Sequence, residues 1–400
     1  MGKPHERLES GQEREIRKLL AELRVMDEGG YFGRAEERPE RGRENPDRAF
    51  AEALLEKSGP FSKMVAGLKP LDYPVGPALS QFMSQMAVRD RTETYKLDAH
   101  KRFGEAEGQV RILFRKISRG EVASNAVIRS IVGSFMDTFM KDRNLLLNLA
   151  TAPCAGDDHL YDHSLKQCLL SLSIASAAGY ARSQAIEIAQ GALLADIGMM
   201  LVPERIRLKR GKLSEGEQFE MRKHPALGLG LLERIHGLSE AVLIIPYQHH
   251  ERVSGNGYPE RRSGAMVSRF SRIAGIADVF TALINRRSYR EPVAPYQAMV
   301  SLLSMGGEGH LDGEYIKHFL RTVSIFPLGS LVRLSSGKVA KVVDPNPAAF
   351  TKPVVSVLTD ESGAVLARNA ISQIDLSASE EKIAEALPGR YIPHHILDGF

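Results

Sequence analysis

The sequence has no tryptophan, only two cysteines, and no uninterrupted apolar run long enough to cross a membrane, which needs roughly 18 residues. Cys154 and Cys168 are too far apart for a CxxC metal pattern, and so few cysteines fit a reducing compartment. The first residues, MGKPHERLESGQERE, are too charged for the apolar core of a signal peptide. We therefore expect a cytoplasmic protein that has no membrane partner.

The sequence also has little excess of either sign of charge. The 53 Lys and Arg residues nearly balance 49 Asp and Glu residues, which leaves a net charge of +4. No long basic run and no alternation of basic with aromatic residues is present, so we do not expect a nucleic-acid partner. The apolar content of 43% is ordinary for a globular protein, and 400 residues are too many for one ordinary domain.

The amino-terminal part of the chain is predicted to be mainly helical. We expect a charged helix in residues 1–32, a disordered linker in 33–48, a small module of unknown role in 49–103, and a helical lead-in to the next domain in 104–150. The linker, GRAEERPERGRENPDR, has almost nothing to bury. The lead-in has apolar residues at helical spacing and is predicted to pack on the next domain. Signal transmission and dimerisation through residues 121–149 are alternatives.

The rest of the chain divides by its apolar period. Residues 151–325 are predicted to form a helical bundle, with helices that begin near 163 and span 183–196, 214–236, 240–247 and 267–283. After Pro327 the period changes to two, which predicts a small β domain in residues 326–376. Its expected strands are 331–334, 339–343, 354–358 and 364–367. A helix at 379–387 is expected in the C-terminal segment 377–400.

Polar side chains interrupt these apolar helices at positions that suggest one shared site. Buried acids are costly unless they are paired or bind a metal, and imidazole with carboxylate suits iron, manganese, zinc, nickel or cobalt. The six candidates are His163, Asp196, His224, His249, His250 and Asp278. Taken singly, each has a plainer explanation. His163 and His224 would lie in solvent, and Asp278 would pair with Arg272 or Arg269.

Several stretches around these residues resemble one family. They are LLADIG at 193–198, KHPALG at 223–228, HHERVSGNGYP at 249–259 and IADVFTALINRRSYR at 276–290. They are similar to the HD-GYP family, HD-domain metal-dependent phosphohydrolases that act on bacterial cyclic dinucleotides, over about residues 150–325. The resemblance implies an all-helical domain in which the six candidates are the metal ligands and Asp196 is also the catalytic residue.

The resemblance implies further roles. It implies one or two divalent ions, with iron or manganese ahead of zinc, nickel and cobalt. Arg287 and Arg290 match the family's phosphate-contacting residues, and a planar guanidinium suits phosphate oxygens. The motif that gives the family part of its name is Gly257, Tyr258 and Pro259.

Two departures from the family pattern fall in the second helix. The family reads LLHDIGK where this sequence reads LLADIGM, so Ala195 replaces a metal-binding histidine and Met199 replaces a lysine. The resemblance then implies that the ligand group of His163, Asp196 and Asp278 has lost one member. The group of Asp196, His224, His249 and His250 is complete. Loss of one metal ligand should cost at least about 10–100-fold in affinity or activity.

These departures leave three hypotheses open. The first is a degenerate module that binds cyclic di-GMP, or a partner such as a diguanylate cyclase (GGDEF) domain, with weak or no hydrolysis. The second is an active metal-dependent cyclic di-GMP phosphodiesterase that forms pGpG or GMP. The third is a scaffold that serves interaction alone. A homodimer is compatible with each of them.

Overall fold

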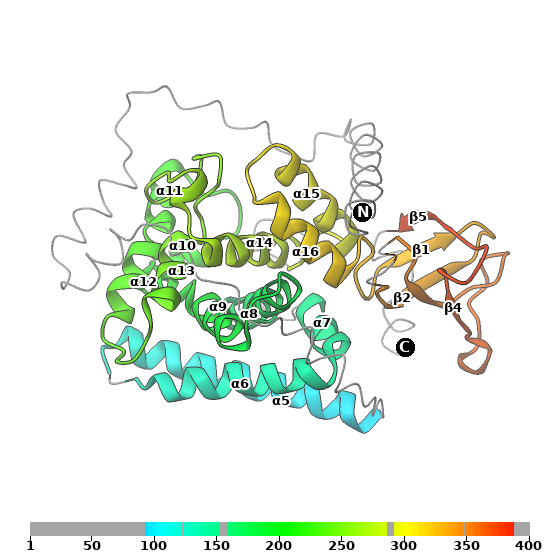
Figure 1. The fold of residues 1–400 in the computed structure, drawn as a ribbon, viewed down its shortest axis with the longest axis horizontal. Coiled ribbons are helices and arrows are strands. Elements are labelled where there is room, and N and C mark those ends of the chain that lie inside the picture. Colours follow the sequence, from blue (N-terminus) through cyan, green and yellow to red (C-terminus); the bar gives the residue numbers. More distant parts are fainter. Residues whose placement is uncertain are drawn as a thin grey trace, which may run out of the picture.

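The computed structural model describes residues 93–121, 123–152, 159–285, 292–346, 349 and 351–387. The predicted charged helix, the predicted linker and most of the 49–103 module lie outside the described residues, as does the tail after residue 387. The described part consists of a helical body with a small β-sheet at one end (Figure 1). The predicted fold class, mainly α with a C-terminal β appendage, is confirmed.

The helical body is built from successive helices. They are α5 (Glu93–Ser118), α6 (Asn125–Lys141), α7 (Arg143–Thr151), α8 (Leu160–Ala177), α9 (Arg182–Leu194), the short 3-10 helix η2 (Ile197–Leu201), α10 (Glu204–Arg207), α11 (Glu215–Arg222), α12 (His224–Leu232), α13 (Glu240–Gln248), η3 (Gly264–Met266), α14 (Arg269–Ile284), α15 (Pro295–Gly307) and α16 (Gly313–Val323). Within the described residues, no helix is both long enough and apolar enough to cross a membrane.

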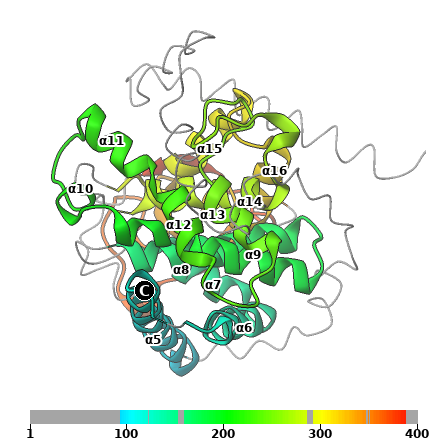
Figure 2. The same ribbon diagram turned by 90° about the vertical axis from the view of Figure 1, so that its left-hand side faces the viewer.

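Helix α8 lies at the centre of this body. Its residues from Leu160 to Ser176 are buried on every side, as expected for a helix that other helices surround. Helices α5, α6 and α7, in the region predicted as a lead-in, pack against one side of α8, and α9, α14 and α16 also pack against it. Figures 1 and 2 show α8 between these helices. The candidate site therefore lies in helices that the core holds in place.

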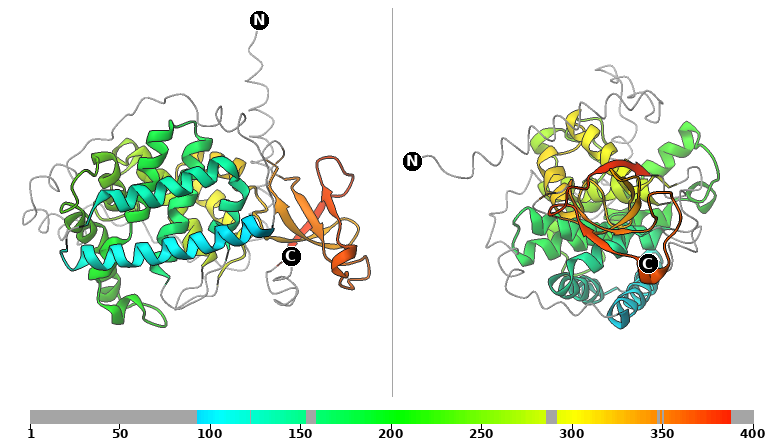
Figure 3. Two further views of the ribbon diagram at one scale, coloured as in Figure 1. Left: turned by 90° about the horizontal axis from the view of Figure 1, so that it is seen from below. Right: turned by 90° about the vertical axis from the view of Figure 1, so that its right-hand side faces the viewer.

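The sheet contains β1 (Leu331–Leu334), β2 (Val339–Asp344), β3 (Val354–Val357), β4 (Gln373–Asp375) and β5 (Ile383–Leu387), in the order β4-β3-β2-β1-β5 with antiparallel pairing throughout. Side chains alternate between its two faces. Val332 and Leu334 join the main hydrophobic core, whereas Leu331 packs in a separate small cluster with Val339. Figure 3 shows the sheet at the end of the helical body.

Two predicted elements of the C-terminal part are wrong. Residues 364–367 form no strand, because Val365 makes only an isolated bridge to Thr359 and stays exposed. The helix predicted at 379–387 is instead strand β5. Its glutamates and alanines favour a helix, but its backbone pairs with β1 and Leu387 is buried. The sheet thus extends to Leu387, beyond the predicted domain end at residue 376.

Candidate metal centre

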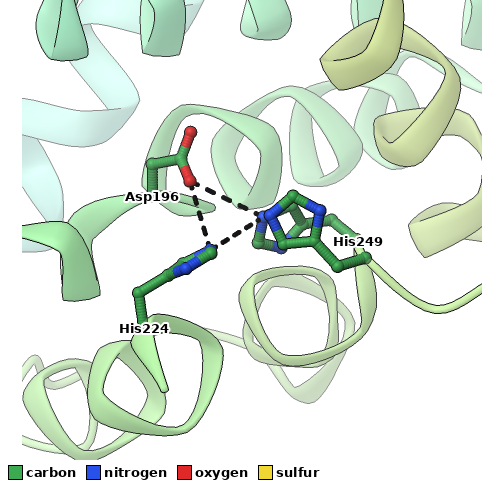
Figure 4. Close-up of side chains that lie close together, drawn as sticks. Asp196, His224 and His249 are labelled. Carbon is green, nitrogen blue, oxygen red and sulfur yellow. Dashed lines mark hydrogen bonds and ion pairs between the residues drawn. The ribbon is translucent and has the colours of Figure 1, made fainter. Parts of the chain in front are cut away.

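Asp196 lies at the junction of two helices and reaches three imidazoles. Helix α9 ends at Leu194, and η2 begins directly after Asp196. The carboxylate places Oδ1 3.3 Å from His224 Nε2 and 3.7 Å from His249 Nε2, and Oδ2 3.3 Å from His163 Nε2. Figure 4 shows Asp196, His224 and His249 pointing toward one another. One carboxylate therefore contacts residues from three other helical segments.

His224 is aimed at this carboxylate by a helix break that the sequence analysis missed. A single helix was predicted over 214–236, but α11 ends at Arg222 and α12 begins at His224. Pro225 lies in the first turn of α12, where its missing N–H costs nothing and where it prevents α11 from continuing. The break turns the His224 side chain into the core, where it is fully buried.

Gly198 allows η2 to approach α12 closely enough for this contact. A β-carbon at Gly198 would lie 1.9 Å from the carbonyl oxygen of His224 and 2.6 Å from the backbone nitrogen of Gly228. Both atoms belong to the backbone, so the clash cannot be relieved by a side-chain rotation. The Asp196–His224 geometry thus depends on a residue without a side chain.

We expect Gly198→Ala to lower the free energy of unfolding by about 1–3 kcal/mol or more, because it overpacks two backbones. Gly230→Ala is the matched control, since a β-carbon in that α12 position meets nothing within 4 Å. We expect it to be neutral or stabilising by up to about 1 kcal/mol. Urea unfolding of both variants measures the difference, and equal stabilities would contradict the close contact.

Hydrogen bonds fix the tautomers of two histidines. His224 Nδ1 lies 2.8 Å from the carbonyl oxygen of Met221, and His249 Nδ1 lies 2.9 Å from that of Pro246. A carbonyl oxygen only accepts, so in each ring Nδ1 carries a proton. The two Nε2 atoms then face each other 3.4 Å apart. Metal-binding histidines usually have this outward Nδ1–H bond, so the pair fits a cation held between the rings.

The second carboxylate, Asp278 on α14, closes the other side of the cluster. Its Oδ1 lies 3.0 Å from His163 Nε2 and its Oδ2 lies 3.5 Å from His250 Nδ1. The plainer explanation with Arg272 is wrong, because Arg272 pairs with Asp312 at 2.8 Å. Asp278 is therefore held by imidazoles.

The six candidate side chains converge in two overlapping groups. One group contains Asp196, His224, His249 and His250, and the other contains His163, Asp196 and Asp278; within each group the donor atoms lie within 4.8 Å of one another. We call them the four-donor group and the three-donor group. Neutral imidazoles and carboxylates of this kind could hold divalent metal ions, with Asp196 shared between two of them.

Burial and charge set the protonation of the cluster. Burial lowers the pKa of His224 to about 4, which keeps this ring neutral and able to bind a metal near neutral pH. Burial acts to raise the pKa of Asp196, but the surrounding imidazoles of His163, His224 and His249 hold it below its ordinary value. Asp196 is thus an anion at neutral pH.

Both departures from the family pattern lie beside Asp196. Ala195 is fully buried at the end of α9 and offers no donor atom. Met199 lies in η2, where it is half-buried and packs against the hydrophobic core. The three-donor group therefore gains no nitrogen or oxygen ligand from either side chain.

The predicted GYP turn packs directly on the cluster. A β-carbon at Gly257 would lie 2.4 Å from the backbone of Glu251 and Arg252, so only glycine fits there. The Tyr258 ring stacks on His250 with centroids 4.5 Å apart. Arg287 and Arg290 lie outside the described residues.

Glu251, for which the sequence predicted no role, holds this turn. Its carboxylate is buried and accepts hydrogen bonds from the backbone N–H groups of Glu260 and Arg262, at 2.8 and 2.9 Å. Burial raises the pKa of Glu251 to about 7. The sequence signal for such a role is an acidic residue directly after the candidate ligands His249 and His250.

Comparison with known proteins agrees with this geometry. A family model described as "HD domain" matches residues 154–315. This chain carries an HD domain. A second family model, described as "KOW domain associated with HD domain", matches residues 331–387, which span strands β1 to β5.

Three curated relatives extend the comparison. Cyclic di-GMP phosphodiesterase PA4108 of Pseudomonas aeruginosa is 28% identical over 73% of this chain and 68% of its own length. Cyclic di-GMP phosphodiesterase PdeB of Borreliella burgdorferi is 24% identical over 53% of this chain and 55% of its own length. The 3'3'-cGAMP-specific phosphodiesterase 2 of Vibrio cholerae is 32% identical over 47% of this chain and 36% of its own length.

The chain therefore spans about two thirds of the first relative and about half or less of the other two. The HD domain and these relatives confirm the predicted resemblance to the HD-GYP family.

Proposed function

We propose that this HD domain is a degenerate HD-GYP module that binds cyclic di-GMP, with weak or no hydrolysis. The observation that carries the proposal is that the two donor groups differ in their number of ligand residues. Asp196, His224, His249 and His250 converge as four donors, whereas the three-donor group adjoins the buried, donor-free Ala195. The complete four-donor group can serve binding, and the missing donor beside the three-donor group is expected to weaken hydrolysis.

The residues of the four-donor group suit one divalent ion, and we propose iron or manganese. Such an ion would attract a phosphate oxygen and polarise water. His224 and His249 present Nε2 toward it because their Nδ1 protons are bonded to backbone carbonyls. Asp196 supplies negative charge to both groups. Arg287 and Arg290 are proposed to contact the phosphates.

The relatives' names support cyclic dinucleotides as the ligand class. Two of them are cyclic di-GMP phosphodiesterases, and the third is specific for 3'3'-cGAMP. One observation favours an active phosphodiesterase as a second candidate, because His163, Asp196 and Asp278 still converge without Ala195 contributing. The degenerate module would leave cyclic di-GMP intact or cleave it only weakly, whereas the active phosphodiesterase would hydrolyse it.

Restoring the two family residues tests the proposal. We expect the metal-reconstituted wild type to leave cyclic di-GMP intact and Ala195→His/Met199→Lys to hydrolyse it, because the histidine completes the three-donor group and the lysine restores a positive charge. Linear products are measured by chromatography after anaerobic loading with iron or manganese. Met199→Lys alone is the control for added charge.

Adding Asp196→Ala to the double variant should abolish the gained turnover, because both groups lose their shared carboxylate. Wild-type turnover that disappears with Asp196→Ala would reject the degenerate module in favour of the active enzyme.

A further inference from the structure

One edge of the donor cluster is more accessible than the rest. The side chains of His224 and His249 are fully buried, and those of His163, Asp196 and Asp278 are at most 8% exposed. The His250 side chain, by contrast, is 15% exposed. Among the six donor residues, His250 is therefore the one whose side chain is most open to a ligand.

Arg222 stands at this edge. It is the last residue of α11, two positions before His224, and it is half-buried. Its guanidinium carbon lies 5.6 Å from the centroid of the Tyr258 ring. That ring stacks on His250 with an interplanar angle of 22°. The Arg222 guanidinium, the Tyr258 ring and the His250 imidazole are thus successive neighbours.

Two neighbouring cations are used in other ways. Arg252 Nη1 donates to the carbonyl oxygens of His249 and Glu251, at 3.1 and 3.0 Å, and so holds the turn. Lys223 pairs with Glu220 and lies over the ring of Phe219 at 4.7 Å.

We propose that Arg222 contacts a phosphate group of the ligand bound at the four-donor group, which makes it a further binding residue of the site. This inference rests on the proposed function. A guanidinium binds two phosphate oxygens at once, is more weakly hydrated than an ammonium, and keeps its orientation when it lies over an aromatic ring.

The test compares Arg222→Ala, Arg222→Lys and Arg205→Ala by calorimetric titration of the metal-loaded full chain with cyclic di-GMP. A charge-assisted hydrogen bond predicts that Arg222→Ala weakens binding about 10- to 100-fold. Arg222→Lys should fall between, since it keeps the charge without the planar fork. Arg205 is an exposed arginine of α10 and belongs to neither donor group, so its variant removes the same charge and should bind as the wild type does.

Metal content and melting temperature separate a ligand contact from a structural role. We expect the metal content and the melting temperature of Arg222→Ala to stay at wild-type values. The proposed contact is overturned if Arg222→Ala binds cyclic di-GMP as tightly as the wild type, if Arg205→Ala weakens binding equally, or if metal is lost together with affinity.

A wild type that binds no cyclic di-GMP would reject the proposed function. The inference would then be judged with inorganic pyrophosphate as the probe. A loss of pyrophosphate affinity confined to the Arg222 variants would support a phosphate contact. Equal affinities, or no binding by any variant, would overturn it.

Discussion

Asp196→Asn is expected to abolish tight metal binding at both donor groups. Asp196 belongs to the four-donor and the three-donor group, and its two carboxylate oxygens face different histidines. Asparagine keeps the shape but removes the negative charge. Loss of a residue one step further from a metal already costs about 10–100-fold, so we expect at least about a 100-fold loss of metal affinity.

Asp278→Asn is the informative comparison for this variant. Asp278 belongs only to the three-donor group, so the protein should keep the metal of the four-donor group. Asp137→Asn, an exposed carboxylate on α6, controls for the change of charge. Elemental analysis after dialysis measures the retained metal. Asp196→Asn and Asp278→Asn with equal metal content would contradict a shared carboxylate.

Lys166→Met is expected to lower the free energy of unfolding by about 3–5 kcal/mol, because it leaves a buried carboxylate without its cation. The Lys166 ammonium lies 2.9 Å from Asp162 Oδ2, and it donates to the carbonyl oxygen of Ala152 at 2.6 Å and to Asn285 Oδ1 at 3.2 Å. Lys166 is 1% exposed. It thereby joins α7, α8 and the end of α14 beneath the candidate metal centre.

A double variant checks the origin of this loss. Adding Asp162→Asn to Lys166→Met removes the uncompensated charge, so the double variant should be more stable than Lys166→Met alone. Lys317→Met is the control, since Lys317 pairs with an exposed glutamate on α16 and such pairs contribute about 0–1 kcal/mol. Urea unfolding compares the midpoints. A Lys166→Met variant as stable as Lys317→Met would contradict the buried network.

The sequence predicted the helices around the site because their apolar residues recur at helical spacing. It also predicted which six side chains to examine, since acids and histidines interrupt those apolar runs. The pairing of His163 with Asp278, rather than Asp278 with Arg272, depends on how α8 packs against α14. Local spacing does not contain that information.

Other features could not be predicted for identifiable physical reasons. Asp162 and Lys166 are four residues apart, a spacing typical of ion pairs on helix surfaces, and only packing of α7 and α14 around them buries the pair. Strand β5 contains good helix formers, and its pairing with β1 overrides that preference. The Arg222–Tyr258 contact joins α11 to a turn that comes much later in the chain.

The proposed binding of cyclic di-GMP without hydrolysis is tested most simply on the bound nucleotide itself. Metal-reconstituted wild type would be incubated with cyclic di-GMP and separated from free ligand, and the bound nucleotide would be identified by chromatography and mass spectrometry. We expect intact cyclic di-GMP in the bound fraction and no linear product in solution. Accumulation of pGpG or GMP, absent with Asp196→Ala, would contradict this expectation.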